Sequence, residues 1–535
     1  MRAGKLSAAA LEEDSSSVNI AIARAATLTS LGNLSSRLIG LVRETVKSFY
    51  FGNGQAASAF ELAANVPTQF YDLLAGGMLS SALVPTFSAL HDDRDPQRLR
   101  AFGELLGALI SLMMAALAGV VALLWLFARP IAVFISGGSN QDVEMVAGLL
   151  RVTIPAIIFL NLSGILTGAL HAQRRFGYTA FTATTYNLVM IAVVVLMESR
   201  LGVTALAVGL LMGSVAQVLI QVPGLRGVPL RLSLNWRLPG VVQVVRLFLP
   251  VAGGLALSQI AVQVSFISAS RISPEGPATM RYAAQVIQFP LGMIVAAVAA
   301  AILPALSSSE GEAFKATLKQ GLRLVVALIA PASVGLYVLA VPMVALLFER
   351  GAFTAQSTAY TASTLRAAVP GLFFAALDLP LIYAFYARRD TRTPTMVGLV
   401  STVTYLLIIG VLTALSELGV RTFTLEDLVL TNSLKTGLDA ALMAMLLHRH
   451  LGSLFSGDLL GWGLRVAGAS LVMGLTVYAT MMALMARFSL GALLNDAVVV
   501  FGCACAGAAV YAGLVRVLGI SDLGQARRLF VRRSL

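Results

Sequence analysis

Apolar runs of roughly the length needed to cross a lipid bilayer recur from one end of the chain to the other. The clearest lie at 104–128, 180–197, 292–306, 396–415 and 493–517. A helix rises about 1.5 Å per residue, so about 20 apolar residues cover the hydrocarbon core. The pattern therefore predicts an all-α polytopic membrane protein.

About fourteen transmembrane helices are predicted when these runs are separated at the polar, glycine-containing and proline-containing stretches between them. They lie near 20–50, 57–90, 101–128, 142–171, 179–198, 202–223, 241–271, 279–307, 318–348, 357–387, 394–416, 425–448, 460–486 and 492–517. The predicted organisation is a tail over 1–18, a six-helix lobe over 19–225, a second six-helix lobe over 238–450, two additional helices over 458–518 and a basic tail over 519–535.

Two pairs of segments resemble each other, which indicates an internal repeat. Residues 151–175 align without a gap with residues 366–390, and residues 83–90 align with 302–309 at nearly the same offset. The matched residues include Arg151 with Arg366, Pro155 with Pro370 and Arg174 with Arg389. The offset spans six predicted helices, an even number, so the copies have the same orientation. This predicts two parallel lobes around a central cavity, an architecture typical of secondary transporters, whereas the alternative is a chance match of short amphiphilic segments.

The charges of the chain are few, and most lie between the apolar runs. Of the 535 residues, 58% are hydrophobic and 12% are charged, and the net charge is +12. A soluble protein would carry about 25% charged residues. Because the excess lysine and arginine lies in short loops rather than on one face of a folded domain, it indicates membrane topology and not nucleic-acid binding.

Alternate loops differ sharply in their positive charge, which predicts the orientation of the chain. One set of loops holds scattered single charges, and the other set holds clusters that face the cytoplasm in polytopic proteins. The clusters include Arg94, Arg98, Arg100, Arg174, Arg175, Arg226, Arg231, Arg237, Lys315, Lys319, Arg388, Arg389, Arg392, Arg449, Arg527, Arg528, Arg532 and Arg533. Both termini are therefore predicted to be cytoplasmic.

Charged residues within the predicted spans are candidates for function, because burying a charge in a bilayer is costly. The first helix carries Arg37 and Arg43 among small residues, with Glu44 and Lys47 close by. Guanidinium groups that face a water-filled cavity would bind an anionic head group, because their planar donors match phosphate oxygens. The alternative for Arg43 is a helix end at the membrane interface.

Weaker candidates lie in three other predicted helices. Glu61 and Asp72 fall in the second helix, which Pro67 is expected to kink. Asp378 lies in the tenth, and Lys435 and Asp439, four residues apart in the twelfth, could pair on one helix face. No phosphate-binding loop and no metal-ligand pattern is present, which predicts transport driven by a gradient or by exchange, without a cofactor.

The predicted helices also carry motifs that resemble the MurJ/MviN lipid II flippases of the multidrug/oligosaccharidyl-lipid/polysaccharide exporter superfamily. The first helix matches the family's Ser-Arg-x-x-Gly-x-x-Arg-[Asp/Glu]. Further matches run along the second, eighth, ninth and tenth helices and cover nearly the whole chain. The matching residues are Ser36, Arg37, Gly40, Arg43, Glu44, Ala59, Phe60, Pro67, Gly77, Val84, Pro85, Tyr282, Ala283, Pro290, Gly292, Ile302–Pro304, Phe348–Phe353 and Ala384–Pro394.

The resemblance implies a flippase that translocates lipid II, the lipid-linked peptidoglycan precursor, from the inner to the outer leaflet through a cationic cavity. Several family cavity charges are replaced here. An acidic residue becomes Ser58, paired arginines become Tyr71 and Asp72, and an Asp-Arg pair becomes Ala284 and Gln285. The cavity is thus less cationic than the family pattern, unless Arg281, Arg271 or Lys435 compensates. The candidate substrate-binding residues are Arg37, Arg43, Glu44, Ser58, Glu61, Tyr71, Asp72 and Gln285, and the candidate ion or helix-pair residues are Asp378, Lys435 and Asp439.

The leading hypothesis is therefore a lipid-linked oligosaccharide flippase, a transporter and not an enzyme, in the bacterial cytoplasmic membrane. Its direction would come from the membrane potential or a monovalent cation, and its partners would be the lipid-linked glycan, the bilayer and cell-wall synthesis proteins. One alternative is a drug or small-cation exporter that binds through Glu61, Asp72 and Asp378. A membrane enzyme using the acidic run His91–Asp95, or a non-transporting cell-wall scaffold, are the others.

Overall fold

The computed structural model describes residues 2–76, 82–90, 95–137, 143–452, 457–488 and 492–520. Within these ranges the chain forms helices and connecting loops and no strand. Each of the fourteen predicted helices has a helical counterpart there, so the predicted all-α fold is confirmed. Predicted features outside the described ranges are Gly77, the run from His91 to Arg94 and the arginines of the C-terminal tail.

The helices divide into two compact units, each described here by itself. Unit 1 comprises Met1–Lys47, Ala59–Gly138 and Asp142–Gln259, and unit 2 contains Ser48–Ser58 and Ile260–Leu535. The end of the first helix and the start of the second therefore pack within unit 2, although most of both helices belongs to unit 1.

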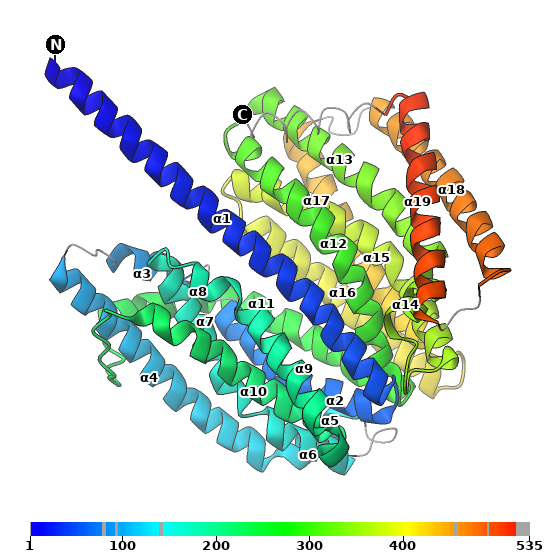
Figure 1. Ribbon diagram of the computed structural model, residues 1–535, viewed down its shortest axis with the longest axis horizontal. Helices are drawn as coiled ribbons and strands as arrows, with labels where there is room; N and C mark the ends of the chain where they lie inside the picture. The colour runs from blue at the N-terminus through cyan, green and yellow to red at the C-terminus, as the bar shows by residue number, and fades with distance from the viewer. Residues whose placement is uncertain are drawn as a thin grey trace. The chain divides into compact units, whose positions relative to one another are not determined.

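Unit 1 is a bundle in which α10 packs against α7 and α9, and α4 packs against α7 (Figure 1). Its core includes Phe87 and Phe102, whose ring centroids are 5.1 Å apart. Asp95 starts α4 by accepting hydrogen bonds from the amides of Gln97 and Arg98, as expected for a helix N-cap. The elements of unit 1 are α1 (Arg2–Phe51), α2 (Gln55–Tyr71), the π-helical turn η1 (Asp72–Gly76), α3 (Val84–Leu90), α4 (Pro96–Leu126), α5 (Ala128–Ile135), α6 (Val143–Thr153), α7 (Ala156–Ala172), α8 (Gly177–Ala180), α9 (Thr182–Leu201), α10 (Thr204–Gln221), η3 (Val222–Leu225) and the first part of α11 (Pro239–Ile272).

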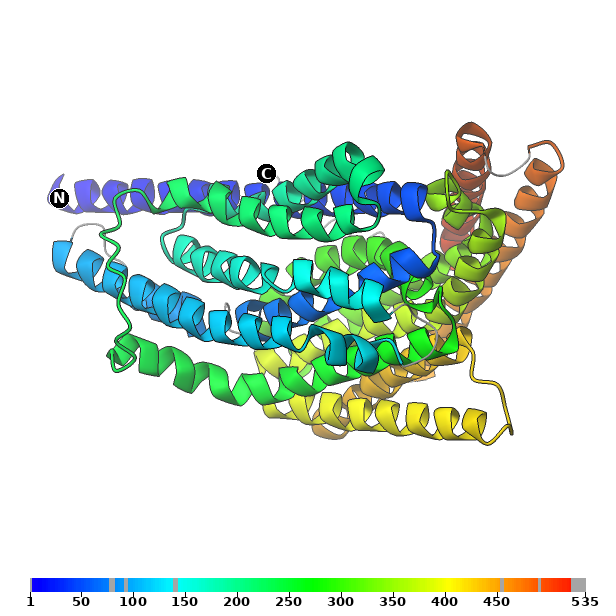
Figure 2. The same cartoon turned by 90° about the horizontal axis from the view of Figure 1, so that it is seen from below.

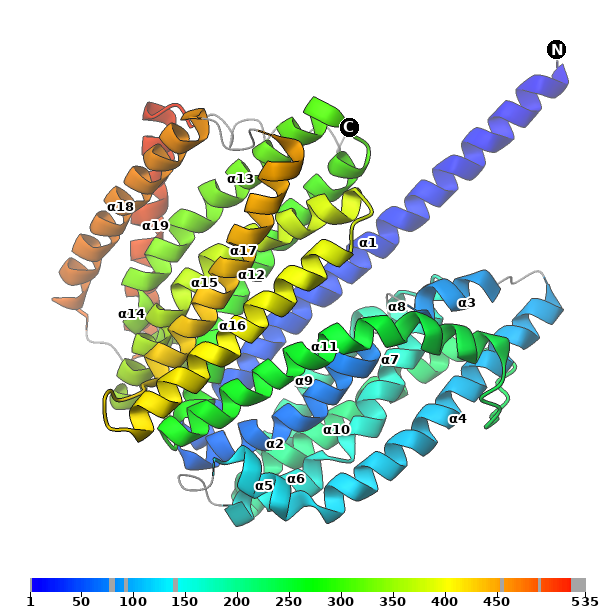
Figure 3. The same ribbon diagram turned by 180° about the vertical axis from the view of Figure 1, so that it is seen from behind.

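Unit 2 is built around α15, which packs against α12, α13 and α17 (Figure 3). The pair α18 and α19 packs against α13 and α14, and the two helices run side by side in Figures 1 and 2. Thr424 and Asp427 form a reciprocal capping box that starts α17. The helices of unit 2 are the second part of α11, α12 (Gly276–Ser307), α13 (Gly311–Val338), α14 (Ala340–Phe348), α15 (Ala355–Ala387), α16 (Arg392–Glu417), α17 (Leu425–Leu451), α18 (Gly457–Met485) and α19 (Leu493–Val517).

Ten helical segments within the described residues are long and apolar enough to cross a membrane. The predicted spans outside these ten coincide with α1, with α2 and α3, with α12 and with α17. All four regions carry candidate site residues, and the charges of α1, α2 and α17 lower their apolar character. The chain is a multi-pass membrane protein whose polar helices are also its candidate functional helices.

Matched positions of the predicted repeat have the same local structure. Arg174 and Arg389 both have positive φ, 57° and 60°, and no other non-glycine residue in the described part does. Each follows the last turn of a helix, α7 or α15, in the left-handed conformation that commonly ends helices. The repeated conformation, which is uncommon for arginine, agrees with an internal duplication.

Candidate functional site

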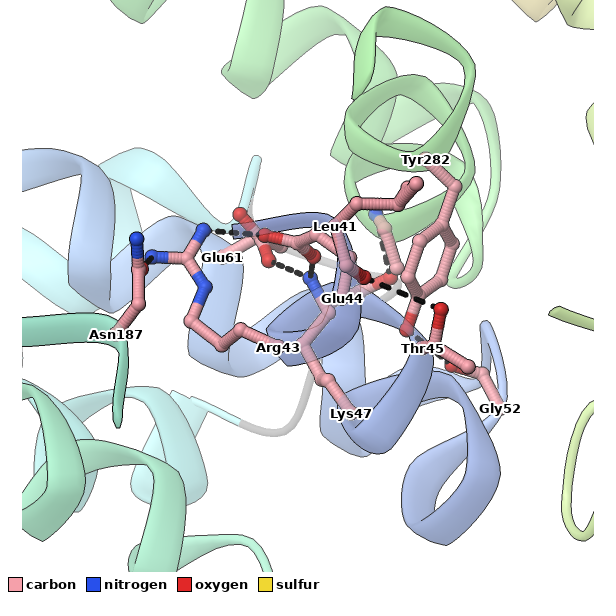
Figure 4. Close-up of polar contacts among 11 residues, drawn as sticks. Leu41, Arg43, Glu44, Thr45, Lys47, Gly52, Glu61, Asn187 and Tyr282 are labelled. Carbon is pink, nitrogen blue, oxygen red and sulfur yellow. Dashed lines mark hydrogen bonds and ion pairs between the residues drawn. The ribbon is translucent and has the colours of Figure 1, made fainter. Parts of the chain in front are cut away.

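A buried cluster of charged side chains joins α1 to α2 within unit 1 (Figure 4). The Lys47 ammonium forms ion pairs with the carboxylates of Glu44 and Glu61. Lys47 and Glu44 are each 2% exposed, and Glu61 is 7% exposed. Arg43 completes the cluster through a 2.5 Å contact between its Nη2 and Glu44 Oε1. We call these four residues the α1–α2 charge cluster.

The α1–α2 charge cluster is balanced, with two cations and two anions. A buried charge without a partner costs several kcal/mol, whereas a paired and hydrogen-bonded one is tolerated. Glu44 and Lys47 therefore allow Arg43 and Glu61 to be placed inside a membrane protein. Arg43 lies within α1, inside the unit, and not at a helix end as in the alternative interpretation, because α1 continues to Phe51.

Asn187, which sequence reasoning missed, fixes the position of Arg43. Its Oδ1 accepts a 3.0 Å hydrogen bond from Arg43 Nη1, and its Nδ2 donates to the carbonyl of Ser36 at 3.3 Å. Asn187 is buried on α9, and the Tyr186 ring centroid lies 5.9 Å from the Arg43 guanidinium carbon. The only signal in the sequence was a polar residue within the apolar run 180–197.

The small residues of α1 allow the close approach between α1 and its neighbours that the sequence predicted. A Cβ atom added to Gly32 would lie 2.0 Å from the carbonyl oxygen of Ala180. One turn further, the hydroxyls of Ser35 and Thr184 are hydrogen-bonded at 2.8 Å. This packing brings the backbone of α1 close enough for Asn187 to reach it.

Arg37 occupies a different side of α1 from Arg43. Six helical residues correspond to a rotation of about 120° beyond whole turns and a rise of about 9 Å. The side chain of Arg37 is exposed, whereas Arg43 is partly buried. Arg37 is therefore a peripheral positive charge, and Arg43 is the guanidinium held within the unit.

Ser58, predicted to contact substrate, lies in unit 2 and packs the start of α2 against α12. Its side chain is fully buried, and its hydroxyl oxygen accepts a 3.2 Å hydrogen bond from the amide of Ala278. Nearby, the Tyr282 hydroxyl donates to the carbonyl of Gly52 at 2.8 Å (Figure 4), and Asn53 donates to Thr279 at 3.1 Å. The carboxylate that the family pattern has at position 58 is instead supplied one turn later, by Glu61.

Tyr71 and Asp72 lie where α2 changes into the π-helical turn η1. Asp72 is exposed, and Tyr71 is partly buried. Gly164 of α7 makes room for this region, because a Cβ there would come within 2.2 Å of Ala75 Cβ and 3.8 Å of the Tyr71 ring. π-helical turns are frequent at functional sites. Gln285 is partly buried on α12, in unit 2.

The structure brings Asp378, Lys435 and Asp439 together within unit 2. Asp378 donates a side-chain hydrogen bond to Asp439, and Asp439 also accepts a 3.2 Å bond from Ser401. The Lys435 ammonium lies 5.9 Å from the centroid of the Tyr405 ring. In the described part of the chain, no ion pair shorter than 4 Å joins Lys435 to Asp439, so the carboxyl groups pair with each other.

Comparison with known proteins gives one consistent family. A model of the family described as "Lipid II flippase MurJ" matches residues 47–499. The "Probable lipid II flippase MurJ" of Haemophilus influenzae is 28% identical over 475 residues, which cover 83% of this chain and 90% of that protein. The "Probable lipid II flippase MurJ" of Vibrio cholerae is 32% identical over 392 residues, which cover 70% of this chain and 74% of that protein.

Solved structures share the fold. A structure described as "Lipid II flippase MurJ, inward closed conformation" matches with a TM-score of 0.77 at 21% identity, covering 92% of this chain and 98% of that chain. An inward-facing multidrug resistance MATE family transporter of the MOP superfamily matches with a TM-score of 0.62 at 16% identity, covering 78% of this chain and 95% of that chain. At these identities the structures establish the architecture alone.

Proposed function

This chain belongs to the lipid II flippase MurJ family, and we propose that it translocates lipid II from the inner to the outer leaflet of the membrane by alternating access. It is a transporter. The polyprenyl tail of the cargo stays in the lipid, and the anionic pyrophosphate and glycan cross through the protein. The two remaining hypotheses, a drug exporter and a non-transporting scaffold, have no comparable support among the relatives.

The observation that carries the proposal is the fixed orientation of Arg43. A guanidinium has five N–H donors, and Arg43 uses one for Glu44 and one for Asn187. Three donors remain for oxygens of a pyrophosphate, and the side chain is 17% exposed. Because the group is already held in place, little conformational entropy is lost on binding.

The balanced charge of the cluster suits a carrier, which must release its cargo as well as bind it. Glu44 neutralises part of the Arg43 charge, so the attraction for a pyrophosphate is weaker than that of a free guanidinium. Arg37, exposed on the same helix, adds a second positive charge that a flexible anionic head group can reach. Binding through one oriented and one mobile guanidinium gives affinity without trapping the cargo.

We propose that the membrane potential supplies the direction of transport. An inside-negative potential drives anionic head groups outward, and one charge moved through 100 mV gains about 2.3 kcal/mol. A monovalent cation could add to this drive, and the Asp378 and Asp439 carboxyl pair of unit 2 is its candidate site. Both termini are proposed to face the cytoplasm of a bacterium, with cell-wall synthesis proteins as partners.

The test is binding and translocation of lipid II by the purified protein in vesicles, compared with Arg43→Ala, Arg37→Ala and the control Arg129→Ala. Arg129 is an exposed arginine that pairs with Glu144 and lies outside the charge cluster. We expect at least a tenfold loss of affinity for Arg43→Ala, a smaller loss for Arg37→Ala and none for Arg129→Ala. If the parent protein neither binds nor moves lipid II, the cargo is wrong. If Arg43→Ala behaves as the parent does, the assigned site is wrong.

A further inference from the structure

Unit 2 contains a cavity of about 320 Å³ that the α1–α2 charge cluster does not border. Its walls come from α11, α12, α15 and α17, with Tyr405 contributed by α16. Most of the lining is apolar. The polar residues that the argument uses are Ser265, Arg281, Gln288, Tyr405, Asn432 and Thr436.

Arg281 gives this cavity a net positive charge. It is the one charged residue among the residues that line the cavity, and neither Asp378 nor Asp439 borders it. An arginine remains protonated at any physiological pH, so the charge is permanent. A cavity with a permanent cation and no carboxylate in its wall selects for an anionic ligand.

The other polar groups provide hydrogen bonding to neutral parts of a ligand. The Asn432 side chain is exposed and offers two N–H donors and a carbonyl oxygen. The Tyr405 hydroxyl is 2.6 Å from the Ser265 hydroxyl, which holds the ring at the cavity wall. Donors and acceptors set in an apolar wall are the usual composition of a small-molecule site.

The volume limits what can enter. At about 30 Å³ per water molecule in the liquid, 320 Å³ corresponds to about ten waters, which is comparable with one sugar ring and smaller than a disaccharide with its peptide. A guanidinium matches phosphate oxygens in a bidentate geometry. Size and charge together indicate a ligand segment with one sugar ring beside a phosphate.

The position of Arg281 relates this cavity to the cationic pattern of the family. Arg281 precedes Gln285 by four residues on α12, so the two lie on one helix face, about 6 Å apart along the axis. Gln285 stands where the family pattern has an arginine. The guanidinium of α12 is thus displaced by one turn and lies in the wall of the unit 2 cavity.

We propose that the cavity of unit 2 is a binding site for a phosphorylated sugar, with Arg281 on the phosphate and Asn432 on the sugar. This deepens the proposed function and rests on it, because the segment would belong to the head group of the lipid-linked cargo. Free sugar phosphates share this chemistry and would enter the same cavity.

The test uses the full-length protein in lipid nanodiscs and N-acetylglucosamine 1-phosphate as the probe, with binding measured by calorimetry. We expect Arg281→Gln to lose affinity about tenfold or more, as for a hydrogen bond to a charged group, and Arg281→Lys to lose less. The control Arg421→Gln, an exposed arginine of unit 2 outside the cavity wall, should bind as the parent does. N-acetylglucosamine without phosphate should bind more weakly and be insensitive to Arg281→Gln.

A second variant tests the cavity without changing its charge. Ala375 lines the cavity, so Ala375→Leu fills part of it and should abolish probe binding. If Arg281→Gln and Ala375→Leu both bind the probe like the parent, the site is overturned. The same result follows if phosphate makes no difference to binding.

Lipid II translocation distinguishes the site from the proposed function. Slower translocation by both cavity variants would assign the site to the cargo. Arg281-dependent binding of the probe, in a parent protein that does not move lipid II, would support the cavity and overturn that cargo. Normal translocation with Arg281-dependent probe binding would support a site for free sugar phosphates and overturn its assignment to the lipid-linked head group.

Discussion

Lys47 of α1 and Glu61 of α2 form an ion pair whose two side chains are almost completely buried. Fourteen residues apart in sequence, they hold two membrane helices together inside unit 1. Glu44 binds the same ammonium and links it to Arg43. The positive charge proposed to meet the cargo is therefore oriented by a network that itself never reaches solvent.

Removal of Lys47 alone should be strongly destabilising. Lys47→Met leaves Glu44 and Glu61 buried without their cation, which costs about 3–5 kcal/mol. The double variant Lys47→Met/Glu61→Gln removes one charge of each sign and keeps the pair of Arg43 with Glu44, so most of the loss should be recovered. Heat-induced unfolding of the detergent-solubilised proteins measures both effects. If the double variant is as unstable as the sum of the two single variants, the pair is not coupled.

Asn187 is predicted to be a positioning residue for Arg43. Asn187→Leu removes the acceptor for Arg43 and the donor to Ser36, and we expect about a tenfold loss of lipid II binding with about 1–3 kcal/mol of lost stability. The control is Thr184→Val, which removes the hydrogen bond to Ser35 from α9. It should reduce stability by about 1 kcal/mol and leave binding unchanged. Equal binding by the parent and Asn187→Leu would contradict the positioning role.

Gly351 should not tolerate a side chain. Its φ is +60°, and an added Cβ would lie 2.2 Å from the carbonyl oxygen of Phe49, a segment that packs within unit 2. Gly351→Ala should therefore lower stability by about 2–4 kcal/mol through backbone strain and steric overlap. Gly410→Ala on α16 is the matched control, because no atom lies within 4 Å of its Cβ position. Similar unfolding temperatures for the two variants would refute the close approach at Phe49.

Arg389 should be replaceable by glycine with a gain in stability. At φ 60° an arginine is strained and a glycine is not, so Arg389→Gly should gain up to about 1 kcal/mol. Arg174→Gly should behave in the same way at the matched position of the repeat. Arg388→Gly serves as the control, because Arg388 has φ −89° and offers no strain to relieve. A loss of stability at both positive-φ sites would show that the arginine side chains matter more than the backbone.

Asp390, in the loop between α15 and α16, is predicted to titrate at unusually low pH. A hydrogen bond from the Thr393 hydroxyl, together with the amides of Thr393 and Arg392, lowers the pKa of its carboxyl group. The stabilisation of this turn is therefore complete above the unfolded-state pKa of about 3.9 and is lost as the pH falls through the lower folded-state pKa. Carboxyl-labelled aspartate, assigned by its disappearance in Asp390→Asn, would give the titration by NMR. Thr393→Val should raise the pKa, and a parent midpoint at or above 3.9 would contradict the prediction.

The positions of the charged residues were readable from the sequence, but their partners were not. The first helix showed Arg43, Glu44 and Lys47 within two turns, and this local spacing suggested a charged site. Asn187 lies 144 residues from Arg43, and nothing in its local pattern indicates which helix it would meet. Ser58 was grouped with the substrate residues because of the family pattern, and packing against α12 makes it a structural contact.

By itself, the sequence determined the membrane class, the helices and the internal repeat. These follow from local physics, because about 20 apolar residues must form a helix in lipid and a repeated motif must fold twice in the same way. Only the tertiary structure decided which charges neutralise one another, that Glu61 supplies the carboxylate beside Lys47, and that Arg281 lies in the wall of a cavity. Such choices depend on which helix faces meet, and interior packing sets these contacts between residues far apart in the chain.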